Sequence, residues 1–246
     1  MKAFILAGGL GTRLRPLVTD RPKSMARIGG RPFLAYQLDL LRSQGFTEIV
    51  LCTGYLSPAI EEHFSGGGDF GVQITYSVEE KPLGTAGAIR YAAHLVDGTF
   101  LVLNGDTYIQ ADLRDLIHFH QCRDALATIG LSQVADPSRS GLVQVDHAGQ
   151  VVRFMEKGTA QGECHTVSAG VYAFEPEILN FIPSDRNVSL ELEVFPHLVE
   201  VKAPLYGYTL GESFVDMGTP EGYWRMQEAI EQLRCRERRR LSAEGL

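Results

Sequence analysis

A short apolar run that leads directly into a glycine-rich turn constrains the fold of this chain most strongly. Residues 3–6 (Ala-Phe-Ile-Leu) read as a buried strand, and residues 8–11 are Gly-Gly-Leu-Gly. Glycine lets the backbone turn sharply and bring its N–H groups close to an anion, where a Cβ would obstruct. Arg13 and Lys23 add fixed positive charge beyond the turn. The segment therefore predicts a cradle for a triphosphate.

Two other glycine-rich nucleotide-binding motifs do not fit this segment. A dinucleotide-binding fingerprint needs a further glycine three residues after Gly11, where this chain has Leu14. A P-loop needs Gly-Lys-Ser/Thr, but Pro22 precedes Lys23. An ordinary tight turn with surface cations is disfavoured because Thr-Arg-Leu-x-Pro follows the glycines.

The first half of the chain alternates apolar strands with amphipathic helices. The expected strands are 3–6, 48–52, 73–78 and 100–103, and the expected helices are 33–43, one beginning at Ser57-Pro58, and 85–95. This βαβ rhythm favours a largely parallel sheet covered by helices on both faces, with ligands beyond the carboxyl ends of its strands. We therefore expect the loops after these strands to converge on one crevice.

The second half is richer in strands. Residues 127–134, 142–145, 151–156 and 167–174 read as strands, and 190–199 and 222–233 read as helices. No hexapeptide repeat is present, so no left-handed β-helix is expected. From Arg234 the run Arg-Cys-Arg-Glu-Arg-Arg-Arg favours a solvated, charged tail that frays from the last helix.

Composition narrows the class of protein. The 246 residues carry a formal net charge of −7, which argues against nucleic acid as a partner. The four cysteines are scattered without a C-x-x-C pair, as in a reduced cytosolic protein. We expect no signal peptide, and no apolar stretch reaches the roughly 18 residues that span a membrane. These features predict a soluble, cytoplasmic protein with no membrane partner.

Carboxylates suited to Mg²⁺ lie in two distant segments. Asp106 follows the strand at 100–103 in an Asn-Gly-Asp-Thr turn, and Asp216 lies between Val215 and Met217. A hard cation such as Mg²⁺ takes few protein oxygens and completes its shell with phosphate and water. A carboxylate between apolar neighbours needs a metal or a basic partner to be buried. His118 and His120, by contrast, would face different sides of a helix and show no metal-ligand spacing.

Residues 6–16, Pro22-Lys23 and the segment 216–220 (Asp-Met-Gly-Thr-Pro) together resemble the signature of sugar-1-phosphate nucleotidyltransferases. The resemblance continues in order as far as Trp224, and it is greatest to guanylyltransferases that act on mannose- or heptose-like 1-phosphates. It implies transfer of a nucleoside monophosphate, favoured from GTP, to a sugar 1-phosphate with release of pyrophosphate. A uridylyl- or thymidylyltransferase remains the alternative. A non-catalytic nucleotide-sugar sensor is a remoter one, since the expected cations and aspartates are all present.

The resemblance also implies a fold. It predicts the α/β class, as a Rossmann-like three-layer α/β/α arrangement with a mixed, mostly parallel central sheet of the nucleotide-diphospho-sugar transferase type. A single domain would span residues 1–233. Its nucleotide-binding half would occupy about 1–125 and its sugar-phosphate-binding half about 126–233, followed by the tail at 234–246. A homo-oligomer is left open.

Site residues follow from the matching segments. Arg13 and Lys23 would be catalytic, with Mg²⁺ held by Asp106 and Asp216 as the implied cofactor. Nucleotide binding is expected from Leu6, Ala7, Gly8, Gly9, Gly11, Thr12, Arg13, Glu79, Pro82, Gly84, Thr85 and Asp106. Sugar-phosphate binding is expected from Asn104, Gly141, Glu156, Lys157 and Gly170.

Two details of these segments bear on specificity. Glu79 matches the base-reading position, where a carboxylate can accept hydrogen bonds from guanine N1–H and N2–H₂. Uridylyltransferase relatives also carry acids nearby, so this match does not by itself decide the base. Gly158 follows the Glu-Lys pair where many relatives have proline, and Ser140 stands where many have tyrosine. Both departures concern the sugar-binding half.

Overall fold

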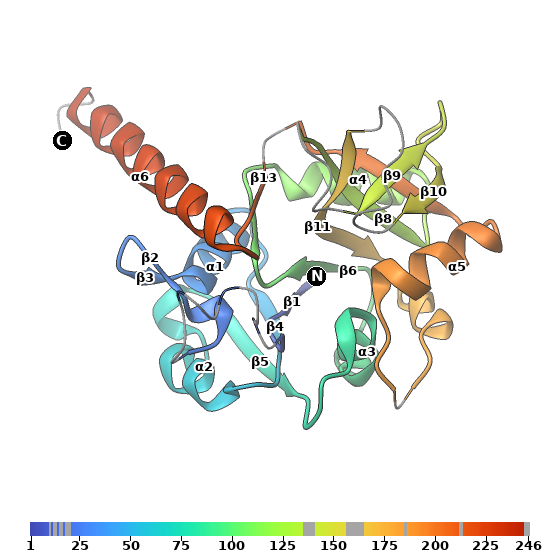
Figure 1. Cartoon of the computed structure of the whole chain (residues 1–246), viewed down its shortest axis with the longest axis horizontal. Helices are drawn as coiled ribbons and strands as arrows, with labels where there is room; N and C mark the ends of the chain where they lie inside the picture. The colour runs from blue at the N-terminus through green and yellow to red at the C-terminus, as the bar shows by residue number, and fades with distance from the viewer. Residues whose placement is uncertain are drawn as a thin grey trace.

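The central strand of the fold is β1 (Lys2–Leu6), which pairs on both sides within a nine-stranded sheet of the computed structural model (Figure 1). The structure describes residues 1–9, 11, 14, 17, 21–134, 141–155, 165–184, 186–211 and 214–243, with the backbone alone at 214 and 233–243. The sheet order is β10-β9-β11-β6-β1-β4-β5. In addition, β8 pairs with β11, and β12 pairs with β8.

The elements lie close to the positions expected from the sequence. The other strands of the sheet are β4 (Glu48–Thr53), β5 (Gln73–Val78), β6 (Phe100–Asn104), β8 (Ala127–Gln133), β9 (Leu142–Val145), β10 (Val151–Met155), β11 (Thr166–Phe174) and β12 (Leu205–Thr209). Two small ribbons pair β2 (Arg27–Ile28) with β3 (Arg31–Pro32), and β7 (Thr107–Ile109) with β13 (Phe214–Asp216). The helices are α1 (Phe33–Ser43), α2 (Ser57–Phe64), α3 (Gly84–Tyr91), α4 (Leu113–Cys122), α5 (Phe195–Glu200) and α6 (Pro220–Ala243).

Alternation along β1 divides the core into two layers of side chains. Ala3 and Ile5 belong to an apolar cluster that includes buried residues of α1, α2 and α4. Phe4 points the other way, into a cluster with buried residues of α3 and α5. Because successive strand side chains face opposite sides of a sheet, helices cover both faces. The expected three-layer α/β fold with a mixed central sheet is confirmed.

The direction of pairing changes across the sheet. Strands β6, β1, β4 and β5 run parallel, whereas β11 runs antiparallel to β6. In the parallel part, Leu6 is level with Cys52 on one side and with Asn104 on the other. The chain therefore leaves three neighbouring strands at one edge of the sheet, as the sequence predicts.

Two helix boundaries differ from expectation. The helix predicted over 85–95 ends at Tyr91, and residues 93–95 form a separate 3-10 turn, a common way for a helix to tighten at its end. Ser57 does not cap α2 but is its first residue, because Leu56 before it adopts a left-handed φ of 57°. The Ser57 hydroxyl donates to the Glu61 carboxylate within the helix.

The two later helices differ more. The helix predicted over 190–199 is divided into a π-helical turn, Leu190–Val194, and α5. Pro196 lies in the first turn of α5 and has no N–H to continue a regular ladder from the preceding turn. The helix predicted over 222–233 spans Pro220–Ala243, so its backbone continues into the segment where the sequence suggests a charged tail. Figure 1 shows α6 projecting away from the sheet.

The histidines follow the expected pattern. On α4, His120 is buried and contacts Thr128 at 2.8 Å and Glu175 at 3.2 Å, whereas His118 contacts the exposed Cys122. The side chains of His118 and His120 thus contact different residues. Within the described part of the chain, no helix has the length and apolar character needed to cross a membrane.

A partly buried polar junction joins the two halves of the chain at Glu191. Its carboxylate accepts hydrogen bonds from the hydroxyls of Thr85 and Ser189, both at 3.0 Å, and from the Tyr172 hydroxyl at 3.3 Å. Thr85 also accepts from the backbone N–H of Leu190 at 2.8 Å. The first turn of α3 is thereby tied to the π-helical turn, which comes from the other half of the chain.

Replacing Thr85 tests the strength of this junction. Thr85→Val keeps the shape of the side chain but leaves the Leu190 N–H without its acceptor, so we expect a loss of about 1–3 kcal/mol in the free energy of unfolding. Thr85→Ser keeps the hydroxyl and serves as the matched control. Urea denaturation of both variants measures the difference in their free energies of unfolding. Equal stability of Thr85→Val and Thr85→Ser would show that the Thr85 hydroxyl does not stabilise the fold.

Candidate active site

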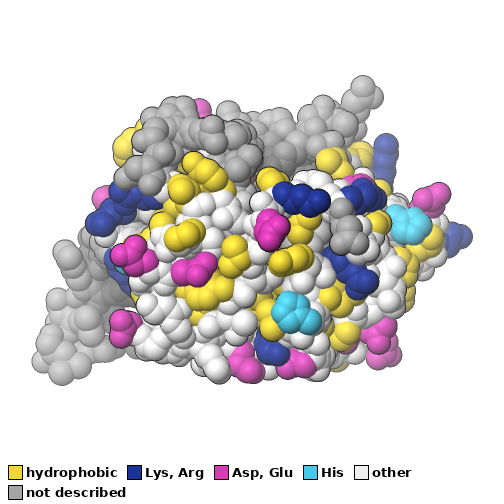
Figure 2. Space-filling view, turned by 90° about the horizontal axis from the view of Figure 1, so that it is seen from below, with side chains coloured by type: hydrophobic (Ala, Val, Ile, Leu, Met, Phe, Trp, Pro, Cys, Tyr) yellow, Lys and Arg dark blue, Asp and Glu magenta, His cyan; other side chains and the backbone are white. Residues whose placement is uncertain are grey.

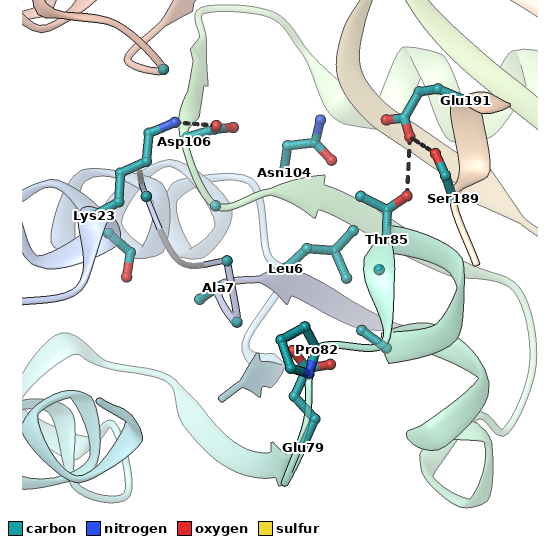
Figure 3. A pocket seen from close by; sticks show the side chains of 18 of the residues that line it. Leu6, Ala7, Lys23, Glu79, Pro82, Thr85, Asn104, Asp106, Ser189 and Glu191 are labelled. Atoms are coloured by element: carbon teal, nitrogen blue, oxygen red, sulfur yellow. Dashed lines mark hydrogen bonds and ion pairs between the residues drawn. The ribbon is translucent and has the colours of Figure 1, made fainter. Parts of the chain in front are cut away.

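One cavity of about 540 Å³ lies at the carboxyl ends of the parallel strands (Figure 3). It is lined by residues of the glycine-rich turn, of the loops after β5 and β6, and of the π-helical turn. Thirteen predicted site residues line it: Leu6, Ala7, Gly8, Gly9, Gly11, Lys23, Glu79, Pro82, Gly84, Thr85, Asn104, Asp106 and Gly141. Thr12, Arg13, Glu156 and Lys157 lie outside the described residues.

The glycine-rich turn is fixed to the neighbouring strand and leaves room for a carboxylate. The N–H of Ala7 donates to the carbonyl of Cys52 at 2.7 Å, which extends the pairing of β1 with β4 by one residue. A Cβ at Gly8 would lie 2.7 Å from Glu79 Oε1, closer than real side chains approach. Gly11 has a φ of +60°, a conformation that glycine adopts without strain. The backbone conformation thus favours glycine at Gly11, and a side chain at Gly8 would displace the Glu79 carboxylate.

Glu79 lies directly after β5 and points into the cavity. Its N–H donates to the carbonyl of Thr53 at 2.8 Å, and its Oε2 accepts from the N–H of Leu83 at 3.3 Å. Burial raises the pKa of the Glu79 carboxyl above its usual range, and the Leu83 hydrogen bond opposes part of that rise. The neighbouring Cys52 thiol, whose pKa burial raises to about 12 with a contribution from Glu79, stays neutral. The half-buried Glu79 carboxylate thus offers hydrogen-bond acceptors at the end of the cavity near Pro82.

The start of α3 approaches the other half of the chain closely at Gly84. A Cβ there would lie 2.5 Å from the carbonyl oxygen of Val188, and the φ of Gly84 is +77°. The same carbonyl accepts from the N–H groups of Ala86 at 3.0 Å and Gly87 at 3.2 Å. This close packing forms one wall of the cavity from residues on both halves.

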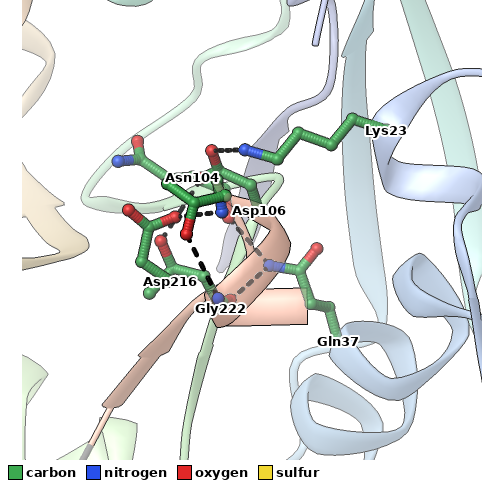
Figure 4. A network of polar contacts seen from close by, with 9 residues as sticks. Lys23, Gln37, Asn104, Asp106, Asp216 and Gly222 are labelled. Atoms are coloured by element: carbon green, nitrogen blue, oxygen red, sulfur yellow. Dashed lines mark hydrogen bonds and ion pairs between the residues drawn. The ribbon is translucent and has the colours of Figure 1, made fainter. Parts of the chain in front are cut away.

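Asp106 and Lys23 form an ion pair on the opposite wall (Figures 3 and 4). The turn after β6 is tight, since a Cβ at Gly105 would lie 2.5 Å from the carbonyl oxygen of Leu6. Lys23 and Asp106 side chains are 13% and 29% exposed, so the pair is only partly screened by solvent. The structure therefore places a cation and a carboxylate beside the glycine-rich turn.

Asp216 comes from far along the chain to the same region. It ends β13, where it pairs with Thr107 of β7, and the N–H of Met217 donates to the carbonyl of Asp106 at 2.8 Å. The Asp216 Oδ1 accepts from the N–H of Gly218 at 2.6 Å. Figure 4 shows the side chains of Asp216 and Asp106 near that of Asn104. The fold thus brings the segment that contains Asp216 next to the Asp106 turn.

The donor set at this convergence fits a hard divalent cation. The two carboxylates supply charge, and the Asn104 Oδ1 is buried without a hydrogen-bond partner among the described residues. An unpaired buried oxygen is costly unless a donor or a cation reaches it. The described residues contain no cluster of three or more His, Cys, Asp or Glu side chains that could hold a metal. Two carboxylates and a neutral oxygen are compatible with a cation such as Mg²⁺, which takes few protein ligands.

Gly141 and Gly170 approach the cavity from the second half. Gly141 lines it, and its carbonyl accepts from the N–H of Ser168 at 2.9 Å. Gly170 has a φ of +68°, and a Cβ there would lie 2.8 Å from Asn104 Nδ2. Gly170 lies against Asn104 but is not among the residues that line the cavity.

Eight lining residues were not predicted: Ser24, Ala88, Gly105, Gly218, Asn187, Ser189, Glu191 and Leu192. The last four lie in one segment, residues 187–192. The segment reads as the start of an amphipathic helix, and Ser189 indeed caps it by accepting from the N–H of Leu192 at 3.1 Å. The signal that could have identified Glu191 is a carboxylate between two leucines with no cation nearby in the sequence. Its partners, Thr85 and Tyr172, are distant in the chain, so local spacing does not reveal them.

Comparison with known proteins agrees with this arrangement. A family model described as nucleotidyl transferase matches residues 2–233. Mannose-1-phosphate guanylyltransferase of Mycobacterium tuberculosis is 41% identical over 225 residues, which cover 91% of this chain and 62% of that protein. UTP–glucose-1-phosphate uridylyltransferase of Synechocystis is 36% identical over 261 residues, covering 100% of this chain and 66% of that protein. The chain thus spans a little under two thirds of the length of these relatives.

Solved structures show the same fold. HddC from Yersinia pseudotuberculosis superposes with a TM-score of 0.82 and 32% identity, covering 93% of this chain and 99% of that one. A second structure of that protein, complexed with GMP-PN, gives a TM-score of 0.81 and 31% identity. The matched segment contains the whole cavity described above, and the resemblance to sugar-1-phosphate nucleotidyltransferases is confirmed: the chain belongs to the nucleotidyl transferase family.

Proposed function

We propose that this protein transfers a nucleoside monophosphate, preferentially from GTP, to a mannose- or heptose-like sugar 1-phosphate and releases pyrophosphate. The observation that carries the proposal is the single cavity that combines the glycine-rich turn, Glu79, and the Lys23–Asp106 pair. The glycine-rich turn suits a triphosphate, and Glu79 suits a base. The Lys23–Asp106 pair suits a phosphate that is bound to a metal ion. Such transfers are catalysed mainly by positioning and by charge stabilisation, with little covalent work for side chains.

The cations have separate roles in this proposal. Arg13 holds the β- and γ-phosphates and stabilises the leaving pyrophosphate, since its planar fork can bind two phosphate oxygens. Lys23, which lies in the cavity, neutralises charge that develops at the α-phosphate. Lys157 holds the sugar phosphate, and Glu156 accepts from sugar hydroxyls. With a net charge of −7, the chain must supply positive potential locally.

Asp106 and Asp216 would hold Mg²⁺, with Asn104 Oδ1 available as a neutral oxygen nearby. When bound, the ion reduces the repulsion between two anionic phosphates and so favours their approach. In the structure described, Lys23 compensates the charge of Asp106, and the Gly218 N–H compensates that of Asp216. Both carboxylates are thus held in place by the fold itself.

The preference for guanine rests on Glu79 and on the relatives. A carboxylate can accept from both N1–H and N2–H₂ of guanine, and the relatives include a guanylyltransferase and a protein solved with GMP-PN. A uridylyl- or thymidylyltransferase is the second candidate, favoured by the relative from Synechocystis. A carboxyl with a raised pKa can also carry a proton and donate to a pyrimidine carbonyl.

Measuring pyrophosphate release tests the reaction and the base together. The protein is incubated with GTP, UTP, dTTP or ATP, each with mannose, heptose and glucose 1-phosphates, in the presence of Mg²⁺. The proposal expects the highest rate with GTP and a mannose- or heptose-like acceptor. No pyrophosphate with any pair, together with measurable nucleotide-sugar binding, would instead identify a non-catalytic sensor.

The metal site gives the first prediction. Asp106→Asn and Asp216→Asn should each lower kcat by at least about a hundredfold, because a lost carboxylate weakens charge stabilisation in the transition state. Initial rates at saturating Mg²⁺ and circular dichroism of each variant are the measurements. Asp69→Asn, at an exposed position remote from the cavity, is the control. Near-normal turnover of a folded variant would exclude that aspartate from the metal site.

The base pocket gives the second prediction. Glu79→Gln replaces one acceptor oxygen with a donor, so the lead of GTP over UTP and dTTP in kcat/KM should narrow by about 5- to 150-fold. ATP should be the poorest substrate of the wild-type protein because adenine N1 is an acceptor that faces the carboxylate. Glu80, the exposed neighbour of Glu79, offers a matched control: Glu80→Gln should keep the preference for GTP over UTP and dTTP. A wild-type preference for UTP or dTTP would refute the guanine assignment alone.

A further inference from the structure

A second cavity, of about 630 Å³, lies on the outer side of α3, away from the strand ends. It is bounded by residues of the segment 80–94, which runs from the loop after β5 through α3, and by Pro183, Ser184 and Arg186. Figure 2 views this lower side of the molecule and shows Lys and Arg side chains beside hydrophobic ones. Its volume is comparable to that of the first cavity, at the strand ends, which we call the substrate cavity. None of the predicted site residues lines the second cavity.

The described walls of this cavity are rich in positive charge. Lys81 and Arg90 line it, and neither forms an ion pair with a described residue. Arg186 also lines it, and its Nη1 lies 2.7 Å from Glu193. Glu80 is the one acidic side chain among the described lining residues. In a chain with a net charge of −7, unpaired cations around a hollow favour an anionic ligand.

The cavity also offers a flat aromatic surface. Tyr91 lines it with 51% of its surface exposed, so its ring is accessible to a ligand. Leu83, Gly87, Ala93 and Pro183 supply apolar walls. Aromatic side chains stack on nucleobases of any sequence, while lysine and arginine bind phosphates. The two chemistries lie within one cavity.

We propose that this second cavity binds a nucleotide, with its base against Tyr91 and its phosphates held by Lys81 and Arg90. The ligand is thus an effector rather than a substrate, because the glycine-rich turn, Lys23 and Asp106 line the other cavity. The proposed binding of a nucleotide in the second cavity does not depend on the proposed transfer reaction. The consequence for catalysis, argued next, rests on the proposed function.

The two cavities share one wall. Leu83 lines the second cavity, donates its N–H to Glu79 Oε2 at 3.3 Å and accepts at its carbonyl from the N–H of Val188 at 2.8 Å. Pro82 lines the substrate cavity, and its carbonyl accepts from Asn187 Nδ2 at 3.1 Å. A ligand that contacts Lys81 and Arg186 therefore acts on the segments that hold the Glu79 carboxylate. Occupancy of the second cavity should change the affinity of the first for its triphosphate.

Equilibrium dialysis with radiolabelled ADP tests the binding step. ADP is the probe because adenine is the base that Glu79 should exclude from the substrate cavity. The wild-type protein should bind ADP at one saturable site. The double variant Lys81→Ala/Arg90→Ala should bind it at least about tenfold more weakly, since charged phosphate contacts are lost. Tyr91→Ala should weaken it severalfold through loss of stacking. Both cations are on the surface, so the variants should fold, as thermal denaturation would check.

Two matched controls separate the cavities. Arg225→Ala removes an exposed cation of α6 and should leave ADP binding unchanged, and Lys23→Ala, in the substrate cavity, should do the same. Absence of saturable binding up to about 1 mM ADP, at the weak end of specific affinities, would overturn the proposal. So would binding that Lys23→Ala abolishes and the double variant retains, because ADP would then occupy the substrate cavity.

A kinetic measurement tests the coupling. ADP should change the KM for GTP severalfold in the wild-type protein and leave it unchanged in the double variant. An ADP effect of equal size in both proteins would exclude coupling through this cavity. If no triphosphate yields pyrophosphate, the proposed function fails, while the dialysis result still decides whether the second site exists.

Discussion

Pairing of β1 on both edges is the constraint on which the rest of the structure depends. Its last residue, Leu6, is level with Cys52 on β4 and with Asn104 on β6, so three chains leave the sheet side by side. Parallel strands with this register must release their loops at the same edge. Shifting β1 by one residue would turn Phe4 out of its apolar cluster and exchange the two faces of the strand. Burial on both faces therefore fixes where the cavity forms.

Close approach of backbone segments then sets the shape of the cavity. Gly105 lies against the carbonyl of Leu6, and Gly84 lies against that of Val188, with no room for a Cβ at either position. The first contact joins the loop after β6 to the glycine-rich turn, and the second joins α3 to the other half of the chain. Rigid walls of this kind hold polar groups in place before a ligand arrives, which lowers the entropy lost on binding.

The sequence predicts the local parts of this site better than the contacts between them. Periodicity placed the strands of the parallel sheet to within about a residue, and the glycine-rich turn, Glu79 and Asp106 follow strands as expected. Helix ends were less accurate where a local effect intervened, as with Pro196 at the start of α5. Glu191 was missed because its role depends on Thr85 and Tyr172, which only the folded chain brings to it. Residues such as Arg13 and Lys157 lie outside the described part, and their roles stay predictions.

Charge compensation explains why the carboxylates of the substrate cavity can coexist in an acidic protein. Asp106 is paired with Lys23, Asp216 accepts from the Gly218 N–H, and Glu191 accepts from three hydroxyls. Among the described residues, the Glu79 carboxylate accepts from the Leu83 N–H alone, and burial raises the pKa of this carboxyl. An acceptor that the fold leaves incompletely satisfied gains most from a ligand that donates two hydrogen bonds. The proposed recognition of guanine by Glu79 therefore rests on a carboxylate that accepts a single hydrogen bond from the described residues.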